Sequence, residues 1–271
     1  GVFLGKGNTI SWEGNQSFSC NSTNMHLGIF AYVDGATFDN VNILVNSDFV
    51  LIGANTFSNG ASAFVGRTKG DTKFYNCDLN ITNATFGVNF SAETSGYTDT
   101  VRLGGFVGWA ESSLQFNNCN LNMSNASLVN NNTRSSKETT LISLGGFVGT
   151  LKGSSSVRSY LNDCSVTMIN SNIISYSVNG AEVGGFLGSA SKTTVKNGVL
   201  DMKNSKIFTE ATKGGLPTGG YNSTSIGGVF GYSGAGSSNT SNGWGFVGNT
   251  IEGFTMTAVN DTFGDIIYAK E

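Results

Sequence analysis

Four aspartates and one histidine are the side chains that could support bond cleavage in this 271-residue chain. Hydrolysis of a glycosidic bond needs two carboxyl groups that face each other across the substrate. Asp71, Asp78, Asp163 and Asp201 do not recur at a fixed spacing, and Asp78 and Asp201 occupy different positions of their expected strands. They could act together only if the folded chain brought them side by side. We therefore expect no catalytic residue, and we expect His26 to be an ordinary polar residue near the first coil.

The four cysteines raise the alternatives of disulfides and of a metal site. A metal site is not expected, because the chain has no Cys-x-x-Cys pair and no cluster of Cys and His. Cys77, Cys119 and Cys164 occupy one position of a repeated pattern, so we expect buried free thiols in a core row. Cys20 lies outside this pattern and could be a cap residue or could pair with Cys77.

Asn-x-Ser/Thr sequences, which accept N-linked glycans on exported proteins, occur along much of the chain. Two of them are expected on the outer face of strands, and four lie in segments between repeated strands. We predict glycans at these six positions: Asn80, Asn89, Asn122, Asn131, Asn222 and Asn239. Asn83 and Asn125 also begin such sequences, but they fall in an expected corner of the fold where access is limited.

The pentapeptide Gly-Gly-Phe-Val-Gly occurs at 104–108 and 145–149 and returns with small changes at 184–188 and 227–231. The spacing between copies stays near 40 residues, which is typical of solenoids and propellers. The Gly-Gly pair predicts a corner with positive φ or with a close backbone approach. Phe106, Phe147 and Phe186 are then expected to anchor the adjoining strand in the core.

The second half of each repeat alternates apolar and polar residues, as in Cys-Asn-Leu-Asn-Met from Cys119 to Met123. Side chains alternate faces along a strand, so the apolar residues of successive copies should stack in rows. One predicted row contains Leu79, Leu121, Val166 and Leu200, and the next contains Ile81, Met123, Met168 and Met202. Asparagines two residues further on predict a stacked corner: Asn83, Asn125, Asn170 and Asn204.

The sequence therefore predicts an all-β protein, a right-handed parallel β-helix in one continuous domain. We expect N-terminal strands or a cap at 1–27, solenoid repeats at 28–250 and C-terminal strands or a cap at 251–271. With about 20 residues for a coil of three short strands, each repeat should hold roughly two coils. Sulfur atoms of the cysteine row would then lie about 10 Å apart, beyond disulfide reach.

Composition narrows the possible partners. The chain has 38 Gly, only 12% charged residues and a net charge of −3, so it lacks the basic face that nucleic acid or an anionic membrane would need. The sequence contains no run of 18 apolar residues, which membrane insertion would need, and it contains no cofactor-binding motif. The apolar segment at residues 1–5 is too short to be a signal peptide, so we expect a mature or excised segment of an exported protein.

Three segments of variable length, 89–97, 130–137 and 213–220, are expected to be protruding loops. Such insertions in solenoids gather on one side and often form a binding face, although they can equally be solvated spacers.

The Gly-Gly-Phe-Val-Gly unit is followed about ten residues later by an aromatic residue, Asn and a small residue, as in Phe116 to Cys119. This pattern resembles the GLUG repeat of bacterial and protist cell-surface proteins over residues 28 to 260. The resemblance implies an extracellular, adhesin-like or structural protein built on a parallel β-helix, and it implies no catalytic residue. The chain departs from the family pattern by Phe in place of the usual Leu and by Cys at a small-residue position.

Both ends of the chain contain apolar, strand-like segments, at Val2–Leu4 and at 254–259. Uncapped strands expose unpaired N–H and C=O groups that can pair with another chain. We therefore expect a non-catalytic structural or adhesive surface glycoprotein. Its partners would be further copies joined through terminal coils, surface glycans or other surface proteins. The alternative is a carbohydrate-binding or polysaccharide-cleaving β-helix.

Overall fold

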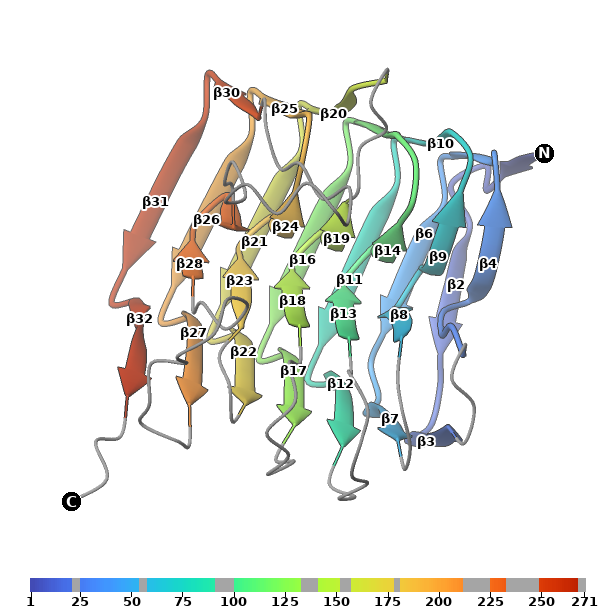
Figure 1. Ribbon diagram of the computed structural model, residues 1–271. Helices are drawn as coiled ribbons and strands as arrows, with labels where there is room; N and C mark the ends of the chain where they lie inside the picture. The colour runs from blue at the N-terminus through green and yellow to red at the C-terminus, as the bar shows by residue number, and fades with distance from the viewer. Residues whose placement is uncertain are drawn as a thin grey trace, which may run out of the picture.

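The computed structural model describes residues 1–20, 25–53, 58–90, 100–132, 141–151, 157–177, 181–211, 225–232 and 249–267. These residues form 32 strands in five parallel sheets, and the coils stack from the N-terminal end to the C-terminal end of the molecule (Figure 1). The fold is a parallel β-solenoid, and the described ranges contain no helix. Accordingly, none of the described residues belongs to a helix long and apolar enough to span a membrane.

Three sheets, A, B and C, contain seven strands each. Sheet A comprises β1 (Val2–Leu4), β5 (Thr37–Asp39), β10 (Thr72–Tyr75), β15 (Leu114–Asn117), β20 (Ser159–Asn162), β25 (Thr193–Lys196) and β30 (Thr250–Glu252). Sheet B comprises β2 (Thr9–Trp12), β6 (Asn42–Val45), β11 (Asp78–Thr82), β16 (Asn120–Ser124), β21 (Ser165–Ile169), β26 (Val199–Lys203) and β31 (Thr255–Val259). Sheet C comprises β3 (Gln16–Cys20), β7 (Phe49–Gly53), β12 (Thr85–Phe90), β17 (Ser127–Asn132), β22 (Asn172–Ser177), β27 (Lys206–Ala211) and β32 (Thr262–Ile267).

Two further sheets contain the glycine-rich part of each repeat. Sheet D comprises β8 (Ser58–Ser62), β13 (Thr100–Gly104), β18 (Leu141–Gly145), β23 (Glu182–Gly184) and β28 (Ser225–Gly227). Sheet E comprises β4 (Phe30–Asp34), β9 (Val65–Lys69), β14 (Val107–Ala110), β19 (Val148–Leu151), β24 (Leu187–Ala190) and β29 (Phe230–Tyr232).

Each sequence repeat forms one coil, so the prediction of roughly two coils per repeat is wrong. The chain passes through sheets E, A, B, C and D in order, and five strands complete the circuit. Equivalent residues of consecutive repeats are direct strand neighbours: Phe74 pairs with Phe116, and Leu79 pairs with Leu121. The error came from assuming three strands per coil, because the short strands of sheets D and E use the residues that a second coil would have needed.

The two predicted core rows are confirmed. Leu79, Leu121, Val166 and Leu200 pair in register through sheet B, and so do Ile81, Met123, Met168 and Met202. All eight side chains are buried. The alternation of apolar and polar residues therefore sets both the strand and its inner face.

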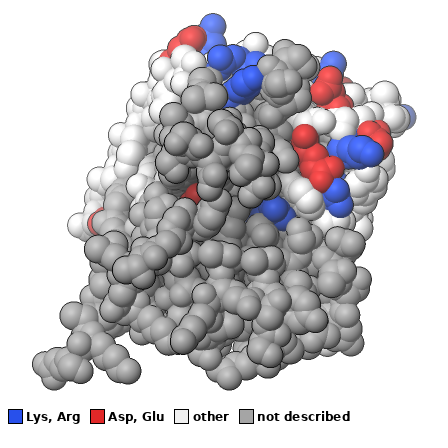
Figure 2. Space-filling view, viewed as in Figure 1, with Lys and Arg blue, Asp and Glu red and all other residues white. Residues whose placement is uncertain are grey.

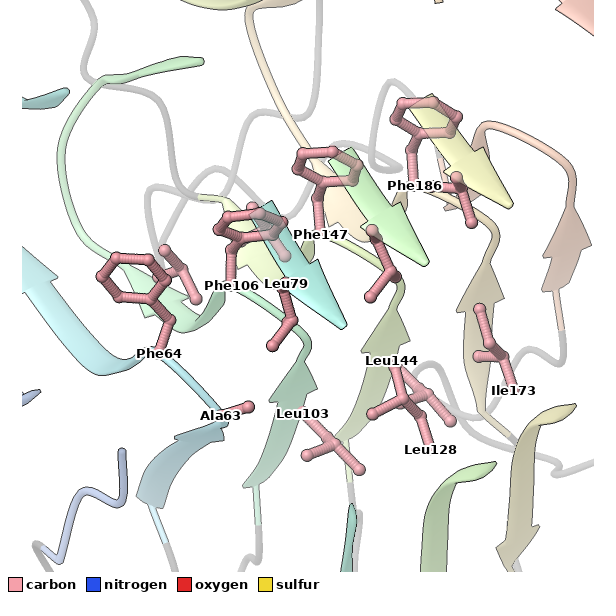
Figure 3. Close-up of a cluster of buried hydrophobic side chains, with 14 of the residues drawn as sticks. Ala63, Phe64, Leu79, Leu103, Phe106, Leu128, Leu144, Phe147, Ile173 and Phe186 are labelled. Atoms are coloured by element: carbon pink, nitrogen blue, oxygen red, sulfur yellow. The ribbon is translucent and has the colours of Figure 1, made fainter. Parts of the chain in front are cut away.

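Phenylalanine rings form two further rows inside the solenoid, and Phe106, Phe147 and Phe186 are anchors as predicted. Figure 3 shows one row from Phe64 through Phe106 and Phe147 to Phe186. The rings of Phe106 and Phe147 stack with centroids 4.8 Å apart, and those of Phe147 and Phe186 with centroids 5.2 Å apart. A parallel row on sheet A contains Phe74 and Phe116, which meets Phe106 edge to face. These are the preferred geometries of aromatic pairs.

The cysteine row is buried and free, as predicted, but its spacing differs from the prediction. Cys77 and Cys119 lie on adjacent coils, because one repeat is one coil, and their thiols are close enough to hydrogen-bond. Cys77 is the donor in this contact with Cys119, so the contact, together with burial, raises the pKa of the Cys77 thiol. The Cys77 Sγ also donates to the Tyr75 carbonyl at 3.2 Å. Cys77 is free, so the alternative of a bridge to Cys20 does not hold in this structure.

The predicted asparagine corner is confirmed, and a second one separates sheets A and B. Asn83, Asn125, Asn170 and Asn204 adopt positive φ, between 48° and 51°. The side-chain amides of Asn125, Asn170 and Asn204 each donate to the side-chain oxygen of the asparagine in the preceding coil, as from Asn125 to Asn83 at 3.2 Å. The second corner contains Asn40, Asn76, Asn118, Asp163 and Asn197, also with positive φ. Asparagine suits both corners because it tolerates this conformation and supplies a donor and an acceptor.

The Gly-Gly corner between sheets D and E is required by close backbone approach and not by positive φ. A Cβ atom on Gly145 would lie 2.5 Å from the amide nitrogen of Gly188 and 2.8 Å from the carbonyl oxygen of Phe186. Both neighbours are backbone atoms that cannot move aside without breaking the strand contacts. This approach folds the outer faces of sheets D and E toward each other.

Two of the three expected loops begin as strands. Asn89 belongs to β12, and Asn130 and Asn131 belong to β17. Phe90 and Asn132 end these two strands, and 91–97, 133–137 and the whole of 213–220 lie outside the described residues.

Candidate functional site

The outer face of sheet D contains a row of polar residues that interrupts an otherwise apolar sequence. Arg102 pairs with Gly60 on one side and with Ser143 on the other, and Ser143 pairs with Glu182. The neighbours of Arg102 in its strand, Val101 and Leu103, are core residues, so Arg102 faces away from the core. It is nevertheless only 4% exposed.

Sheet E has an equivalent outer row. Arg67 pairs with Tyr32 in the preceding coil and with Trp109 in the next, and Trp109 pairs with Thr150. Because the Gly-Gly corner brings the two sheets together, the two rows meet. The guanidinium carbon of Arg102 lies 4.0 Å from the centre of the Trp109 ring, and that of Arg67 lies 4.2 Å from it. Both distances are within the range of cation–π contacts.

We name the resulting group the arginine cluster: His26, Arg67, Arg102, Trp109 and Glu111. Figure 2 shows acidic and basic side chains gathered over the strands of sheet E near the N-terminal coils. Arg67 donates from Nη2 to a carboxylate oxygen of Glu111, and the side chains of this ion pair are 23% and 25% exposed. The cluster thus runs from a half-buried ion pair to a buried guanidinium.

His26 links the cluster to the backbone of sheet D. Its Nδ1 atom lies 3.3 Å from the amide nitrogen of Gly60, and its Nε2 atom lies 3.0 Å from Nη1 of Arg67. Both neighbours are donors, yet a neutral imidazole has one accepting nitrogen. His26 can therefore accept from only one of them at a time.

Charge and burial shift two pKa values in the arginine cluster. Burial, together with the smaller effects of the positive charges of Arg67 and Arg102, lowers the pKa of His26 to about 4. Burial also lowers the pKa of Arg102 to about 10, helped by Arg67 and opposed by Glu111. At neutral pH the histidine is therefore neutral, and both arginines are charged.

Hydrogen-bond donors exceed acceptors in the arginine cluster. Among the described residues, four buried donors have no hydrogen-bond partner: Nε and Nη1 of Arg102, Nε of Arg67 and Nε1 of Trp109. A buried donor without a partner costs free energy, and a charged one costs more. The carboxylate of Glu111 is the one acidic group in this set, and it is paired with Arg67.

Further along sheets D and E, the outer rows contain carboxyl and hydroxyl side chains in place of arginines. Glu182 is 7% exposed, and the Ser143 hydroxyl donates to its Oε2 atom at 2.9 Å. Burial raises the pKa of Glu182 to about 7, although the Ser143 hydrogen bond opposes this shift. The Thr150 hydroxyl is buried without a partner. The two outer rows thus change from cationic to neutral and acidic over two coils.

The four aspartates weighed as catalytic groups are not brought together. Asp71 accepts from the Ser113 hydroxyl at 2.6 Å, and Asp78 accepts from the Asn120 amide at 2.8 Å. Asp163 accepts from the Asn197 amide at 2.9 Å, and Asp201 lies on β26 between Thr167 and Thr257. None of the four belongs to the arginine cluster.

His26 does lie near the first coil, as predicted, but its contacts with Arg67 and Gly60 were missed. The arginine cluster was missed because none of its members recurs from repeat to repeat. One signal was available in the sequence: the residue two positions before Gly-Gly is Arg102 in one repeat, Ser143 in the next and Glu182 in the third. Charged side chains are rarely buried without a partner, so a charged residue in an apolar strand indicates a specific contact there.

The predicted glycan acceptors stay predictions. Asn80 and Asn122 lie on the outer face of sheet B, where the Asn122 amide donates to Asn80 at 3.0 Å, and Asn89 and Asn131 pair in sheet C. All four are half-buried. Asn83 and Asn125 are exposed, so the prediction of limited access at this corner is wrong. Asn222 and Asn239 lie outside the described residues.

A second surface feature is a polar depression over sheet A, next to Tyr160, Asn162, Lys196 and Glu252. Its side chains are those of a regular outer sheet face, without a buried unpartnered group. Within the described ranges, no three His, Cys, Asp or Glu side chains are placed to hold a metal ion.

Comparisons with known proteins leave the family open. No protein-family model matches the chain, and no curated protein and no solved structure matches it. The resemblance to the GLUG repeat therefore stays a prediction from the sequence.

Proposed function

We propose that this chain is part of a non-catalytic structural or adhesive protein of the cell surface or extracellular space, a glycoprotein whose solenoids join end to end into a fibre. The observation that carries the proposal is the state of the two terminal coils. Every residue of β1, β30 and β31 is exposed. The large apolar residues among them include Val2, Leu4, Ile251, Met256 and Val259, exposed by 44% to 69%.

The two ends are compatible because they continue the same rows. In sheet A, Phe3 pairs with Phe38 at one end, and Ile251 pairs with Val195 at the other, in a single row. In sheet B, Ile10 and Met256 are the two ends of another row. A second copy placed on Ile251 through its own Phe3 would extend both rows and would pair strand edges that have one neighbour each. A contact between two different surfaces of this kind generates an open filament.

Electron microscopy of the native protein tests this proposal. We expect filaments with an axial repeat of about 34 Å, which is seven strand spacings. Ile251→Lys places a charge at the end of an apolar row, so it should abolish filaments. Ile169→Lys is the matched control, because Ile169 is 43% exposed on the side of the solenoid, and this variant should still assemble. Dispersed particles of the unsubstituted protein at all concentrations tested would refute end-to-end assembly.

The alternative, a carbohydrate-binding or polysaccharide-cleaving solenoid, gains support for binding from one observation. The arginine cluster has unpartnered buried donors, which an acidic ligand could satisfy. The four aspartates first considered for cleavage lie apart, which gives cleavage no comparable support.

A further inference from the structure

We propose that the arginine cluster, with the adjoining outer rows of sheets D and E, binds an acidic saccharide through its carboxylate group. This inference names a ligand class for the adhesive role proposed above, and it does not depend on end-to-end assembly. It starts from the imbalance of hydrogen-bond donors and acceptors among His26, Arg67, Arg102, Trp109 and Glu111.

The first step is the charge of the cluster. Arg67 and Arg102 are charged, His26 is neutral at neutral pH, and Glu111 is the single carboxylate in the group. Because Glu111 pairs with Arg67, the charge of Arg102 is not balanced within the cluster. Burying such a charge is strongly unfavourable unless an anion accompanies it. Among the described residues Arg102 thus lacks an anionic partner of its own, and the proposed ligand supplies one.

The second step is geometry. Arg102 presents two unpartnered donors, Nε and Nη1. A third, Nε1, belongs to Trp109, whose ring Arg102 contacts, and a fourth, Nε, belongs to Arg67, which contacts the same ring. The two N–H directions differ, because Nη1 lies on the Cδ side of the guanidinium and the Nε–H points to the other side, so each is a separate donor to an anionic oxygen. The indole fixes both guanidinium groups in place, which lowers the entropy lost on binding.

The third step concerns the rest of the ligand. In sheet D the outer row continues from Arg102 through Ser143 to Glu182, which is two strand spacings away, or about 10 Å. In sheet E the outer row continues from Trp109 to Thr150, whose hydroxyl is unpartnered among the described residues. Hydroxyl and carboxyl groups of this kind pair with sugar hydroxyls. A ligand with a carboxylate at one end and hydroxyl groups along its length fits this order, and a uronic-acid oligosaccharide is such a molecule.

Isothermal titration calorimetry on the full chain tests the proposal with four probes. These are a galacturonic acid trimer, its neutral methyl ester, sodium acetate and sodium sulfate. We expect the trimer to bind at least about tenfold more tightly than the ester, because the ester leaves the buried guanidinium without an anion. It should also bind more tightly than acetate or sulfate, which lack the hydroxyl groups. Equal binding of acetate or sulfate would refute the saccharide assignment, and absence of trimer binding would refute the site.

Variants locate the binding. Arg102→Gln and Arg67→Gln should each weaken trimer binding by at least about tenfold. Arg102→Lys keeps the charge but loses the planar guanidinium and its fixed donors, so it should also weaken binding. Lys196→Gln removes one positive charge from the exposed face of sheet A and should leave binding unchanged. Thermal unfolding of each variant shows whether it is folded, and Arg67→Gln, a half-buried position, keeps the test valid if Arg102→Gln does not fold.

The outcomes are separable from those of the fibre proposal. Ile251→Lys should stop assembly and leave trimer binding intact, whereas Arg67→Gln should do the reverse. Loss of binding in Lys196→Gln, with binding retained in the arginine variants, would place the saccharide on sheet A and overturn the proposal.

Discussion

His26 and Glu182 are two titratable side chains whose pKa values are shifted by the fold, and their effects on stability have opposite signs. The pKa of His26 falls from 6.5 to about 4, and the pKa of Glu182 rises from 4.5 to about 7. In both cases burial favours the neutral form. Both shifts therefore report a cost of charging the outer rows of sheets D and E.

The sign of each contribution follows from which state binds the proton. As pH falls from 6.5 to 4, the unfolded chain protonates His26 before the folded protein does, so stability is lost toward acid. As pH rises from 4.5 to 7, the unfolded chain ionises Glu182 while the folded protein keeps it protonated, so stability is lost toward neutral pH. Between pH 4.5 and 6.5 the two slopes oppose each other.

We predict that removing either group reveals the slope of the other. In Glu182→Gln, the free energy of unfolding should rise with pH between 4.5 and 6.5, and the variant should gain up to about 3 kcal/mol over the unsubstituted protein at pH 7. In His26→Gln, the same free energy should fall with pH across this window. Urea unfolding at pH 4.5, 5.5, 6.5 and 7.5 measures both. Parallel profiles for all three proteins would contradict the assigned shifts.

At the scale of the strands and corners, the asparagine ladders have a direction. Each side-chain amide donates toward the preceding coil, from Asn170 to Asn125 and from Asn125 to Asn83. An aspartate has no such donor, and Asp163 accordingly only accepts, from Asn197. An aspartate in a ladder can therefore accept a hydrogen bond from the next coil but cannot donate one to the preceding coil.

Substitutions at Asn125 separate the two roles of a ladder asparagine. Asn125→Gly keeps access to positive φ and loses the amide contacts, so we expect a loss of about 1 kcal/mol. Asn125→Ala loses the contacts and also strains the backbone at φ 48°, which should add about 1 kcal/mol more. Urea unfolding measures the difference. Equal stability of the two variants would show that the left-handed conformation costs nothing at this corner.

The strands of sheet B could be predicted from the sequence more completely than those of sheets D and E. Leu121 and Met123 were placed correctly because alternation identifies the inner face of a strand without knowledge of its neighbours. The strands of sheets D and E were underestimated, since Gly104 and Gly108 are poor strand residues and their backbone contacts depend on adjacent coils. Arg102 could not be interpreted from sequence, because its meeting with Trp109 requires the Gly-Gly corner to be folded.

At the scale of the whole molecule, the pairing of like residues makes one coil a unit that can be removed. Asn117 pairs with Asn162, so a deletion of 119–163 joins two equivalent corners. We predict that this deletion folds into a solenoid one coil shorter, with β-rich circular dichroism and cooperative unfolding. It would also place Glu182 beside Arg102, where an ion pair would lower the pKa of Glu182 and abolish trimer binding.

The matched control is a deletion of 119–140, which removes part of a coil. It joins strands that belong to different sheets, so every later row would be displaced from its partner, and we expect no cooperative unfolding. Cooperative unfolding of both deletions would show that register between coils does not determine the fold.

Five strands per coil also determine how the molecule responds to force. The chain enters the stack at one end and leaves at the other (Figure 1), so tension applied through its ends acts along the stack and detaches terminal coils one at a time. Each coil is about 4.8 Å thick. It contains about 40 residues, which extend to about 130 Å when pulled straight. A surface fibre built this way would lengthen in large steps under load, each dissipating the energy of one coil, before the chain itself was strained.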